Sequence, residues 1–203
     1  YPGAPLKNNT FFGGNLWGVA QKLDYLASLG VKVIYLSPIF KAYSNHKYDT
    51  GDYEMIDPAF GGEEAFAHLI AKAGERGMRV ILDGVFNHTG DDSRYFNRYG
   101  NYDTVGAYQS VNSPYFDWYY FKKHPDSYLC WWDIPILPKM NLSNPVTHRY
   151  FVGKGGIIEK YTKMGVLGWR LDVVDELPND FLDELRLRVK KHTNGEGIVL
   201  GEV

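Results

Sequence analysis

The chain has 203 residues and a formal net charge of −2, so it is long enough to bury a sizeable core and lacks the basic surplus of proteins that bind nucleic acid or anionic membranes. No apolar stretch approaches the ~20 residues of a membrane span, the N-terminus has no signal-peptide pattern, and Cys130 is the only cysteine. We therefore expect a soluble globular protein without a disulfide framework, cytoplasmic rather than secreted, and with no nucleic-acid or membrane partner.

The hydrophobic pattern of the first half alternates between helices and strands. Apolar residues at helical spacing predict a helix over residues 16–26 that ends before Gly30, and the aliphatic run 31–36 predicts a strand. A second helix is expected over residues 66–73, and a strand around Val80 follows it.

The second half continues this alternation. Asn144 and Pro145 are typical of a helix start, as cap and first residue, and the glycines that follow predict an irregular or broken helix. The last helix, over about residues 180–192, carries acidic residues early and basic residues late, which complements the helix dipole. With strands near Leu167 and Ile198, the series predicts an α/β fold with a parallel sheet.

Far more residues separate the strands near Val80 and Leu167 than the roughly 10 to 12 that a crossover between parallel strands needs. The excess falls mainly in residues 89–143, which we interpret as an inserted subdomain between a first part (1–88) and a second part (144–203). The insert is rich in Tyr, Phe and Trp. Since it has few aliphatic residues, most of these rings are expected to form its small core.

Polar side chains stand at or near the C-terminal ends of three strands. Asp83 lies in the first of them, with Asn87 and His88 at its end, and Asp172 and Glu202 lie in the next two, both of which we expect to be buried. The carboxyl ends of parallel strands meet at one edge of a sheet, where α/β enzymes place their chemistry. Any one acid could be structural, bonded to backbone donors. Their repetition favours a catalytic pair, Asp172 and Glu202.

These motifs resemble those of a known family. DGVFNHTG, GWRLDVVDE and the terminal GEV resemble the first three signature regions of the alpha-amylase superfamily of retaining glycoside hydrolases, in the same order and at similar spacing. GVKVIYLSPIF resembles the second barrel strand of that family, and LPKMN resembles the motif that closes its inserted domain. SNHKYDTGDY, LPKMN and WRLDVVDE are most similar to the neopullulanase and cyclomaltodextrinase branch, which acts on α-glucans.

The resemblance implies a partial TIM-type (β/α)8 barrel, comprising about the second to the fifth strand, with an irregular subdomain inserted after the third. The chain looks truncated at both ends, so the strands near Val31 and Ile198 should be sheet edges. The family's third catalytic carboxylate, the Asp of a later Asn-His-Asp motif, has no counterpart in the 203 residues. The isolated piece is therefore expected to be inactive.

A mechanism follows from the two acids. Arg170 and Asp172 are two residues apart in a strand and face the same side, so the guanidinium should keep the carboxylate ionised and oriented. The resemblance implies that Asp172 is the nucleophile in cleaving α-1,4 and also α-1,6 glucosidic bonds through a covalent glycosyl-enzyme. Glu202 would be the acid and base, kept protonated by apolar neighbours such as Leu200 and Val203.

Further site residues follow from the resemblance, position by position. His88 and Asp83 match residues that contact the hydroxyls of the cleaved sugar or shape its subsite, and Tyr48 matches the aromatic residue that stacks on that ring. His46 is a further candidate for substrate binding. As structural alternatives, His88 could be a satisfied histidine at a strand end and Tyr48 a ring that packs a loop. Some aromatic residues of the insert would also present their faces to sugars.

One departure from the family concerns calcium. Many amylases follow the nucleophile with a Lys-His pair, tied to substrate binding and to a calcium site that also uses the asparagine matching Asn87. Asp175 and Glu176 stand there in this chain. We therefore expect no cofactor, with Asn87 as the candidate ligand if calcium binds.

Other functions fit the same fold. A transglycosylase or sugar isomerase differs in whether water or another sugar intercepts the intermediate, and the sequence does not separate these from a hydrolase. A non-catalytic relative, such as the ectodomain of amino-acid transporter heavy chains, has the same barrel but no enzymatic activity. The presence of Asp172, Glu202, Arg170 and His88 argues against it. The expected partners are α-glucan oligosaccharides or polysaccharides, and the oligomeric state is left open.

Overall fold

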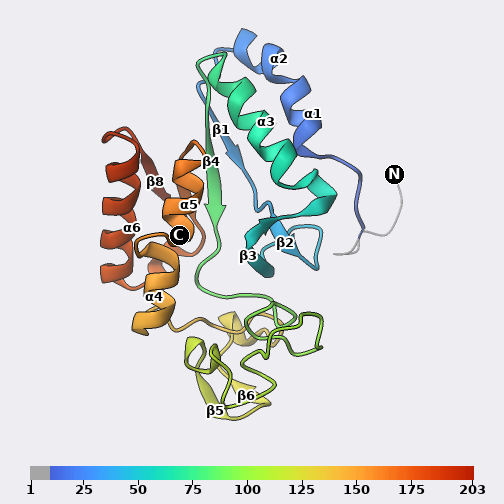
Figure 1. Cartoon of the computed structure of the whole chain (residues 1–203), viewed down its shortest axis with the longest axis vertical. Helices are drawn as coiled ribbons and strands as arrows, with labels where there is room; N and C mark the ends of the chain where they lie inside the picture. Colours follow the sequence, from blue (N-terminus) through green and yellow to red (C-terminus); the bar gives the residue numbers. More distant parts are fainter. Residues whose placement is uncertain (1–9) are drawn as a thin grey trace.

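The computed structural model describes residues 10–203, which contain a four-stranded parallel sheet in the order β1-β4-β7-β8. Figure 1 labels β1, β4 and β8 of this sheet. Its strands are β1 (Val33–Leu36), β4 (Arg79–Gly84), β7 (Val166–Leu171) and β8 (Ile198–Gly201). Each lies in an aliphatic run that the sequence predicts as a strand. In the described part of the chain β1 and β8 are the edges of this sheet, as expected.

Two short helices, α1 (Leu16–Gln21) and α2 (Leu23–Ser28), stand where the pattern predicted one. The backbone leaves helical geometry at Lys22 (φ −96°, ψ 1°), and its N–H donates to the Val19 carbonyl at 3.0 Å, a turn one residue tighter than an α-helix. Hydrophobic spacing cannot report such a break, because side chains on both sides of it still face the core. Helix α3 (Gly62–Gly74) contains the predicted second helix.

The later helices confirm the predicted pattern, including the break. Asn144 accepts hydrogen bonds from the first turn of α4 (Pro145–Val152), and the glycine-rich segment after it separates α4 from α5 (Ile157–Lys163). Helix α6 (Asn179–His192) matches the predicted last helix. Among residues 10–203, no helix is both long and apolar enough to cross a membrane.

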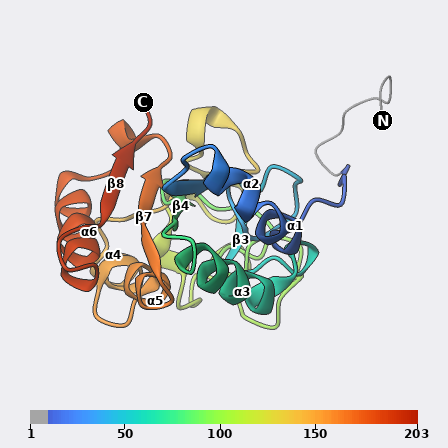
Figure 2. The same ribbon diagram turned by 90° about the horizontal axis from the view of Figure 1, so that it is seen from above.

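The two faces of the parallel sheet differ in what covers them. Alternate strand residues point to opposite faces, and Val80, Leu82 and Trp169 are buried on the side where α3, α5 and α6 pack (Figure 2). Tyr35 and Leu200, on the opposite face, are exposed. The expectation that β8 is buried is therefore wrong: within the described chain only β7 pairs with it, and its last two residues are exposed.

A hairpin that the sequence pattern did not predict follows β1. It pairs β2 (Phe40–Ala42) with β3 (Thr50–Ile56) in an antiparallel arrangement with register irregularities, which obscure any alternation in the sequence. The connecting loop, residues 43–49, carries the predicted site residues His46 and Tyr48. Lys47 anchors this loop, because its buried ammonium group pairs with the Asp57 carboxylate.

The segment 89–143 is mostly irregular and lies beyond the C-terminal end of β4 (Figure 1). Its strands β5 (Phe121–Lys123) and β6 (Ser127–Tyr128) form a two-stranded ribbon. Phe96 and Trp118 are buried among other rings, which agrees with the expectation that aromatic residues form its core. The described residues also form four short 3-10 helices: η1 (Pro58–Phe60), η2 (Phe116–Trp118), η3 (Trp131–Asp133) and η4 (Val174–Glu176).

Candidate active site

The strand register places the two predicted acids next to each other. Arg170 of β7 pairs with Asp83 of β4 on one side and with Leu200 of β8 on the other. Asp172 and Glu202 follow Arg170 and Leu200 by two residues each, so both project from the same face at the C-terminal edge of the sheet. The predicted arrangement on neighbouring parallel strands is present.

The guanidinium group of Arg170 contacts all three carboxylates of the site. Its Nη1 lies 3.1 Å from Oδ2 of Asp83 and 3.0 Å from Oδ1 of Asp172. Its Nη2 lies 3.4 Å from Oε2 of Glu202. Because the arginine side chain is only 16% exposed, water screens these attractions less than it would at the surface. Arg170 therefore holds the three acids together.

Asp83 is buried at the centre of a hydrogen-bond cluster. Its Oδ2 accepts hydrogen bonds from the hydroxyl groups of Tyr35 and Tyr48, the latter at 3.1 Å, and Arg170 donates to both of its oxygens. Burial raises the pKa of Asp83, while the Tyr35 hydroxyl and Arg170 lower it in part. Asp83 thus connects Tyr48 of the hairpin loop to the paired acids. Tyr35 was not predicted as a site residue from the sequence, although it is the second exposed residue of β1 and lies on the same face of the sheet as Asp83.

Burial and the charge of Arg170 shift the pKa of Asp172 in opposite directions. Burial raises its pKa to about 6, the neighbouring Asp83 adds to the increase, and Arg170 opposes it. The expected contact with Arg170 is present, but burial has the larger effect on this pKa. A carboxyl group with this pKa is still mostly ionised at neutral pH, as a nucleophile requires.

Glu202 lies in a more open environment than the sequence predicted. Its Oε2 accepts a hydrogen bond from the Val173 N–H at 3.1 Å, and its side chain is 43% exposed. The apolar neighbours Leu200 and Val203, expected to favour its protonated form, are themselves 54% and 92% exposed. They are exposed because β8 is a sheet edge in the described chain, so its side chains are not covered from the far side.

His88 is almost completely buried beyond the end of β4. Burial lowers its pKa to about 4, so the ring is neutral at physiological pH, although the Tyr48 carbonyl acts in the opposite direction. Its Nε2 makes no well-formed hydrogen bond to any of residues 10–203, while Nδ1 lies 3.3 Å from the side-chain nitrogen of Asn87. A buried nitrogen without a partner is costly, and a ligand hydroxyl could satisfy it.

His46 contacts its own loop. Its Nδ1 lies 3.1 Å from the Ser44 hydroxyl oxygen and accepts a hydrogen bond from the Tyr48 N–H at 3.1 Å. These contacts support the loop conformation that carries Tyr48. We find no described contact that brings the His46 ring to Asp172 or Glu202.

Three residues that the sequence did not mark as site residues connect the insert to the sheet. Glu176, four residues after Asp172, accepts hydrogen bonds from Trp131 Nε1 at 3.1 Å and from Lys139 Nζ at 2.7 Å. Trp131 in turn stacks on the ring of His88. The signal was present in the sequence, because Glu176 replaces the family's histidine, but its partners lie 37 to 45 residues away along the chain.

The described residues offer poor support for calcium at Asn87. The side-chain nitrogen of Asn87 contacts the His88 ring, and the whole Asn87 side chain is buried. Between residues 10 and 203, no group of three or more His, Cys, Asp or Glu side chains is arranged to hold a metal ion. No step of the proposed chemistry is assigned to a metal ion.

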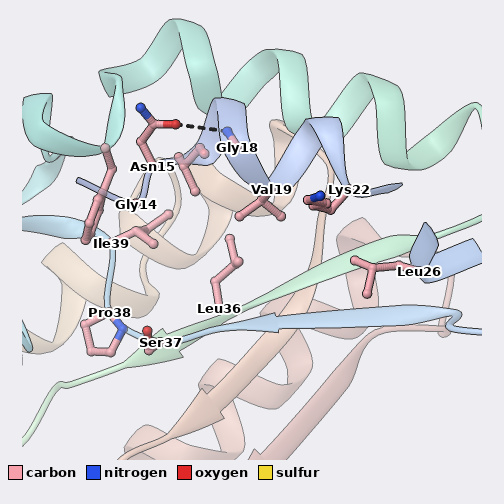
Figure 3. A pocket seen from close by; sticks show the side chains of 12 residues that line it. Gly14, Asn15, Gly18, Val19, Lys22, Leu26, Leu36, Ser37, Pro38 and Ile39 are labelled. Atoms are coloured by element: carbon pink, nitrogen blue, oxygen red, sulfur yellow. Dashed lines mark hydrogen bonds between the residues drawn. The ribbon is translucent and has the colours of Figure 1, made fainter. Parts of the chain in front are cut away.

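A separate pocket of about 480 Å³ lies between α1, α2 and the end of β1 (Figure 3). It is lined mainly by apolar side chains, including Leu16, Val19, Leu26, Leu36 and Ile39. None of the predicted site residues lines it, so the pocket is not part of the candidate active site.

Comparisons with known proteins identify the family of the chain. Residues 4–196 match the family model described as alpha amylase, catalytic domain. The chain is 45% identical over 205 residues to an amylopullulanase of Thermoanaerobacterium saccharolyticum, covering 92% of this chain and 16% of that protein. It is 39% identical over 202 residues to a cyclomaltodextrinase of Geobacillus thermopakistaniensis, covering 96% of this chain and 32% of that protein. The chain thus spans a third or less of the length of these relatives.

Solved structures show the same fold. The type III pullulan hydrolase of Thermococcus kodakarensis superposes with a TM-score of 0.87 at 36% identity, over 99% of this chain and 35% of that one. The cyclic alpha-maltosyl-(1→6)-maltose hydrolase of Arthrobacter globiformis, in complex with maltose, gives 0.88 at 31% identity, over 99% and 45%. Together with the family match over nearly all residues, this shows that the chain belongs to the alpha-amylase family and has its TIM-barrel-type α/β fold.

Proposed function

We propose that the protein is a retaining glycoside hydrolase that cleaves α-1,4 and α-1,6 glucosidic bonds of α-glucans. The observation that carries the proposal is the placement of Asp172 and Glu202 at the ends of neighbouring parallel strands, on one face and within reach of one arginine, Arg170. Two carboxyl groups on adjacent strands are what a double-displacement mechanism at a glycosidic bond needs. The four strands correspond to barrel strands 2 to 5, and residues 89–143 to the inserted subdomain.

The first step uses the two acids in different roles. A carboxylate oxygen of Asp172 forms a bond to the anomeric carbon while the bond from that carbon to the glycosidic oxygen breaks. Glu202 donates its proton to the departing oxygen, so the leaving sugar departs as a neutral alcohol. The product is a glycosyl ester on Asp172 and an ionised Glu202.

The second step reverses these roles. Glu202 removes a proton from a water molecule, whose oxygen attacks the anomeric carbon and displaces Asp172. The sugar is released with its original anomeric configuration, because two inversions have occurred. Both carboxyl groups return to their starting protonation states.

The surrounding residues bind and orient the cleaved sugar. Arg170 fixes both acids, Asp83 shapes the subsite by holding Arg170 and the Tyr48 hydroxyl, and Tyr48 packs its ring on the sugar face. Nε2 of His88, which makes no well-formed hydrogen bond in the described chain, donates to or accepts from a hydroxyl. His46 supports the loop that carries Tyr48.

The names of related proteins support the substrate class. They include amylopullulanase, cyclomaltodextrinase and neopullulanase, and one related structure contains maltose. A Bacillus subtilis relative, 40% identical over 200 residues, is named intracellular maltogenic amylase. This supports a cytoplasmic location for the protein.

The proposal is tested by incubating the full-length protein that contains these residues with a cyclodextrin, pullulan and starch and identifying the products. We expect linear maltooligosaccharides whose new reducing ends are α-anomers when followed by NMR before mutarotation. A 5-fluoro glycosyl fluoride should label the peptide containing Asp172, and the Asp172→Asn variant should stay unlabelled. β-Anomeric products, or labelling of a different residue, would overturn the mechanism, and products longer than the substrate would identify a transglycosylase.

A further inference from the structure

Three aromatic rings form a stack that runs from the buried end of β4 to the surface of the insert. The ring of His88 stacks on Trp131 with centroids 5.4 Å apart, and Trp131 stacks on Trp132 with centroids 5.2 Å apart. His88 is 1% exposed, whereas Trp132 is 77% exposed. The outer ring therefore presents a large apolar surface to solvent beside a residue of the candidate site.

Polar contacts fix the middle ring in place. Nε1 of Trp131 donates to Oε1 of Glu176 at 3.1 Å, and Lys139 holds the other oxygen of that carboxylate at 2.7 Å. The Trp131 N–H donates to the Leu137 carbonyl at 3.0 Å. Since Glu176 lies in η4, directly after the strand end that carries Asp172, these bonds tie the stack to the candidate active site.

The backbone at Trp132 is in a conformation that a bulky side chain rarely adopts. Its φ and ψ are 49° and 36°, in the left-handed region, and the next residue, Asp133, also has a positive φ of 57°. This geometry is unfavourable for a residue with a Cβ, and an exposed tryptophan regains little from packing. Strained backbone of this kind is concentrated at ligand-binding sites.

We propose that the outer face of Trp132 binds a glucose unit of the α-glucan chain, next to the unit held between Asp172 and Tyr48. The C–H groups on one face of a pyranose pack on an indole ring, and the indole N–H bonds a sugar hydroxyl. We call the outer face of the Trp132 ring the platform. Because Trp131 and Glu176 hold this ring in place before substrate arrives, little conformational freedom is lost on binding. This inference rests on the proposed function and adds a binding site for the glucan outside the cleaved unit.

The test measures how affinity grows with glucan length. In the Asp172→Asn background, which prevents turnover, maltose and maltoheptaose are titrated by calorimetry into proteins carrying Trp132→Asn, Trp132→Tyr or Tyr25→Ala. Tyr25→Ala is the matched control, because this tyrosine is 62% exposed on α2, away from the stack.

We expect Trp132→Asn to weaken maltoheptaose binding about fivefold to tenfold while changing maltose binding less, the range that aromatic stacking supports. Trp132→Tyr, which keeps a ring, should retain most of the affinity, and Tyr25→Ala all of it. Asn tolerates the left-handed backbone, so the unfolding temperature of Trp132→Asn should not fall. If the Trp132 ring only supported the fold, Trp132→Asn would instead lower the unfolding temperature and weaken the binding of both sugars equally.

The outcome separates this inference from the proposed function. If the parent protein hydrolyses starch and Trp132→Asn binds maltoheptaose as tightly as the parent does, the platform is wrong and the function stands. If the Asp172→Asn parent binds maltoheptaose but the full-length protein that contains these residues hydrolyses no α-glucan, the hydrolase assignment fails, while the effect of Trp132→Asn on binding can still be measured. If affinity increased equally with glucan length in every variant, the proposed binding of glucose to Trp132 would also be overturned.

Discussion

Nη1 of Arg170 lies 3.0 Å from Oδ1 of Asp172, and this contact joins a positive charge to the group that we assign as nucleophile. The same guanidinium also contacts Asp83 and Glu202. Three carboxylates so close together would repel each other without a cation between them. The proposed chemistry therefore depends on an arginine that itself does not react.

Replacing Arg170 should alter the pH dependence of the reaction as well as its rate. Arg170 lowers the pKa of Asp172, which burial raises to about 6, so in Arg170→Met this pKa should rise further. We expect kcat/KM to fall roughly 100-fold or more at neutral pH. The acidic limb of its pH profile should move to higher pH.

Arg170→Lys separates charge from geometry. Lysine keeps the positive charge but cannot bridge several carboxylates with a planar fork. The acidic limb should therefore move less than in Arg170→Met, while kcat/KM still falls. An unshifted limb in Arg170→Met, despite the lost activity, would contradict the electrostatic role.

Because of Asp172, the free energy of unfolding should decrease as pH rises. Its pKa of about 6 in the folded chain exceeds the ordinary value of 3.8, so the folded state binds more protons between these values and its stability decreases as pH rises through them. Asp172→Asn removes this effect and should stabilise the protein by about 2 kcal/mol at pH 7.5. Urea unfolding at pH 7.5 and pH 4.5 measures it, and the advantage should fall by roughly two thirds at the lower pH.

The loss of activity on replacing Glu202 should depend on whether the leaving group needs a proton. Glu202→Gln cannot donate a proton, so turnover of starch should fall by roughly 100-fold or more. An α-glucosyl fluoride, whose fluoride departs without protonation, should be affected far less in the first step. Single-turnover measurements on both substrates provide the comparison, and equal losses would reject the acid role of Glu202.

The strands and the pairing of the acids could be predicted because both depend on local sequence. Aliphatic runs mark β1, β4, β7 and β8, and a period of two places Arg170 and Asp172 on one face. The order of the parallel strands then brings Glu202 beside Asp172. These features need no knowledge of residues far away in the chain.

What could not be predicted depends on distant contacts. The hairpin of β2 and β3 is short and irregular, so its hydrophobic pattern carries no alternation. The bonds from Trp131 and Lys139 to Glu176 span 37 to 45 residues of irregular chain. The exposure of Glu202 depends on what covers β8, which the strand's own apolar residues do not reveal.

The buried ion pair behind the Tyr48 loop should be essential for stability. Lys47→Met leaves the Asp57 carboxylate buried without its cation, which costs about 3 to 5 kcal/mol. Adding Asp57→Asn removes that charge and keeps the Oδ1 acceptor for the Ala59 N–H, so the double variant should recover part of the loss. Chemical denaturation of both variants tests this. A double variant less stable than Lys47→Met would show that the uncompensated charge is not the cause.

Gly168 should control the spacing between the two catalytic strands. It is paired with Ile198, and a Cβ placed on it would lie 1.8 Å from the Ile198 carbonyl oxygen, so Gly168→Ala must push β8 away from β7. Because Asp172 and Glu202 extend from these strands, activity should fall by more than tenfold, with a loss of about 2 to 3 kcal/mol in stability. The matched control is Gly74→Ala near the end of α3, where a Cβ meets open space. Calorimetric unfolding and starch hydrolysis should distinguish the two variants, and a fully active Gly168→Ala would contradict the proposed coupling between strand spacing and the acid pair.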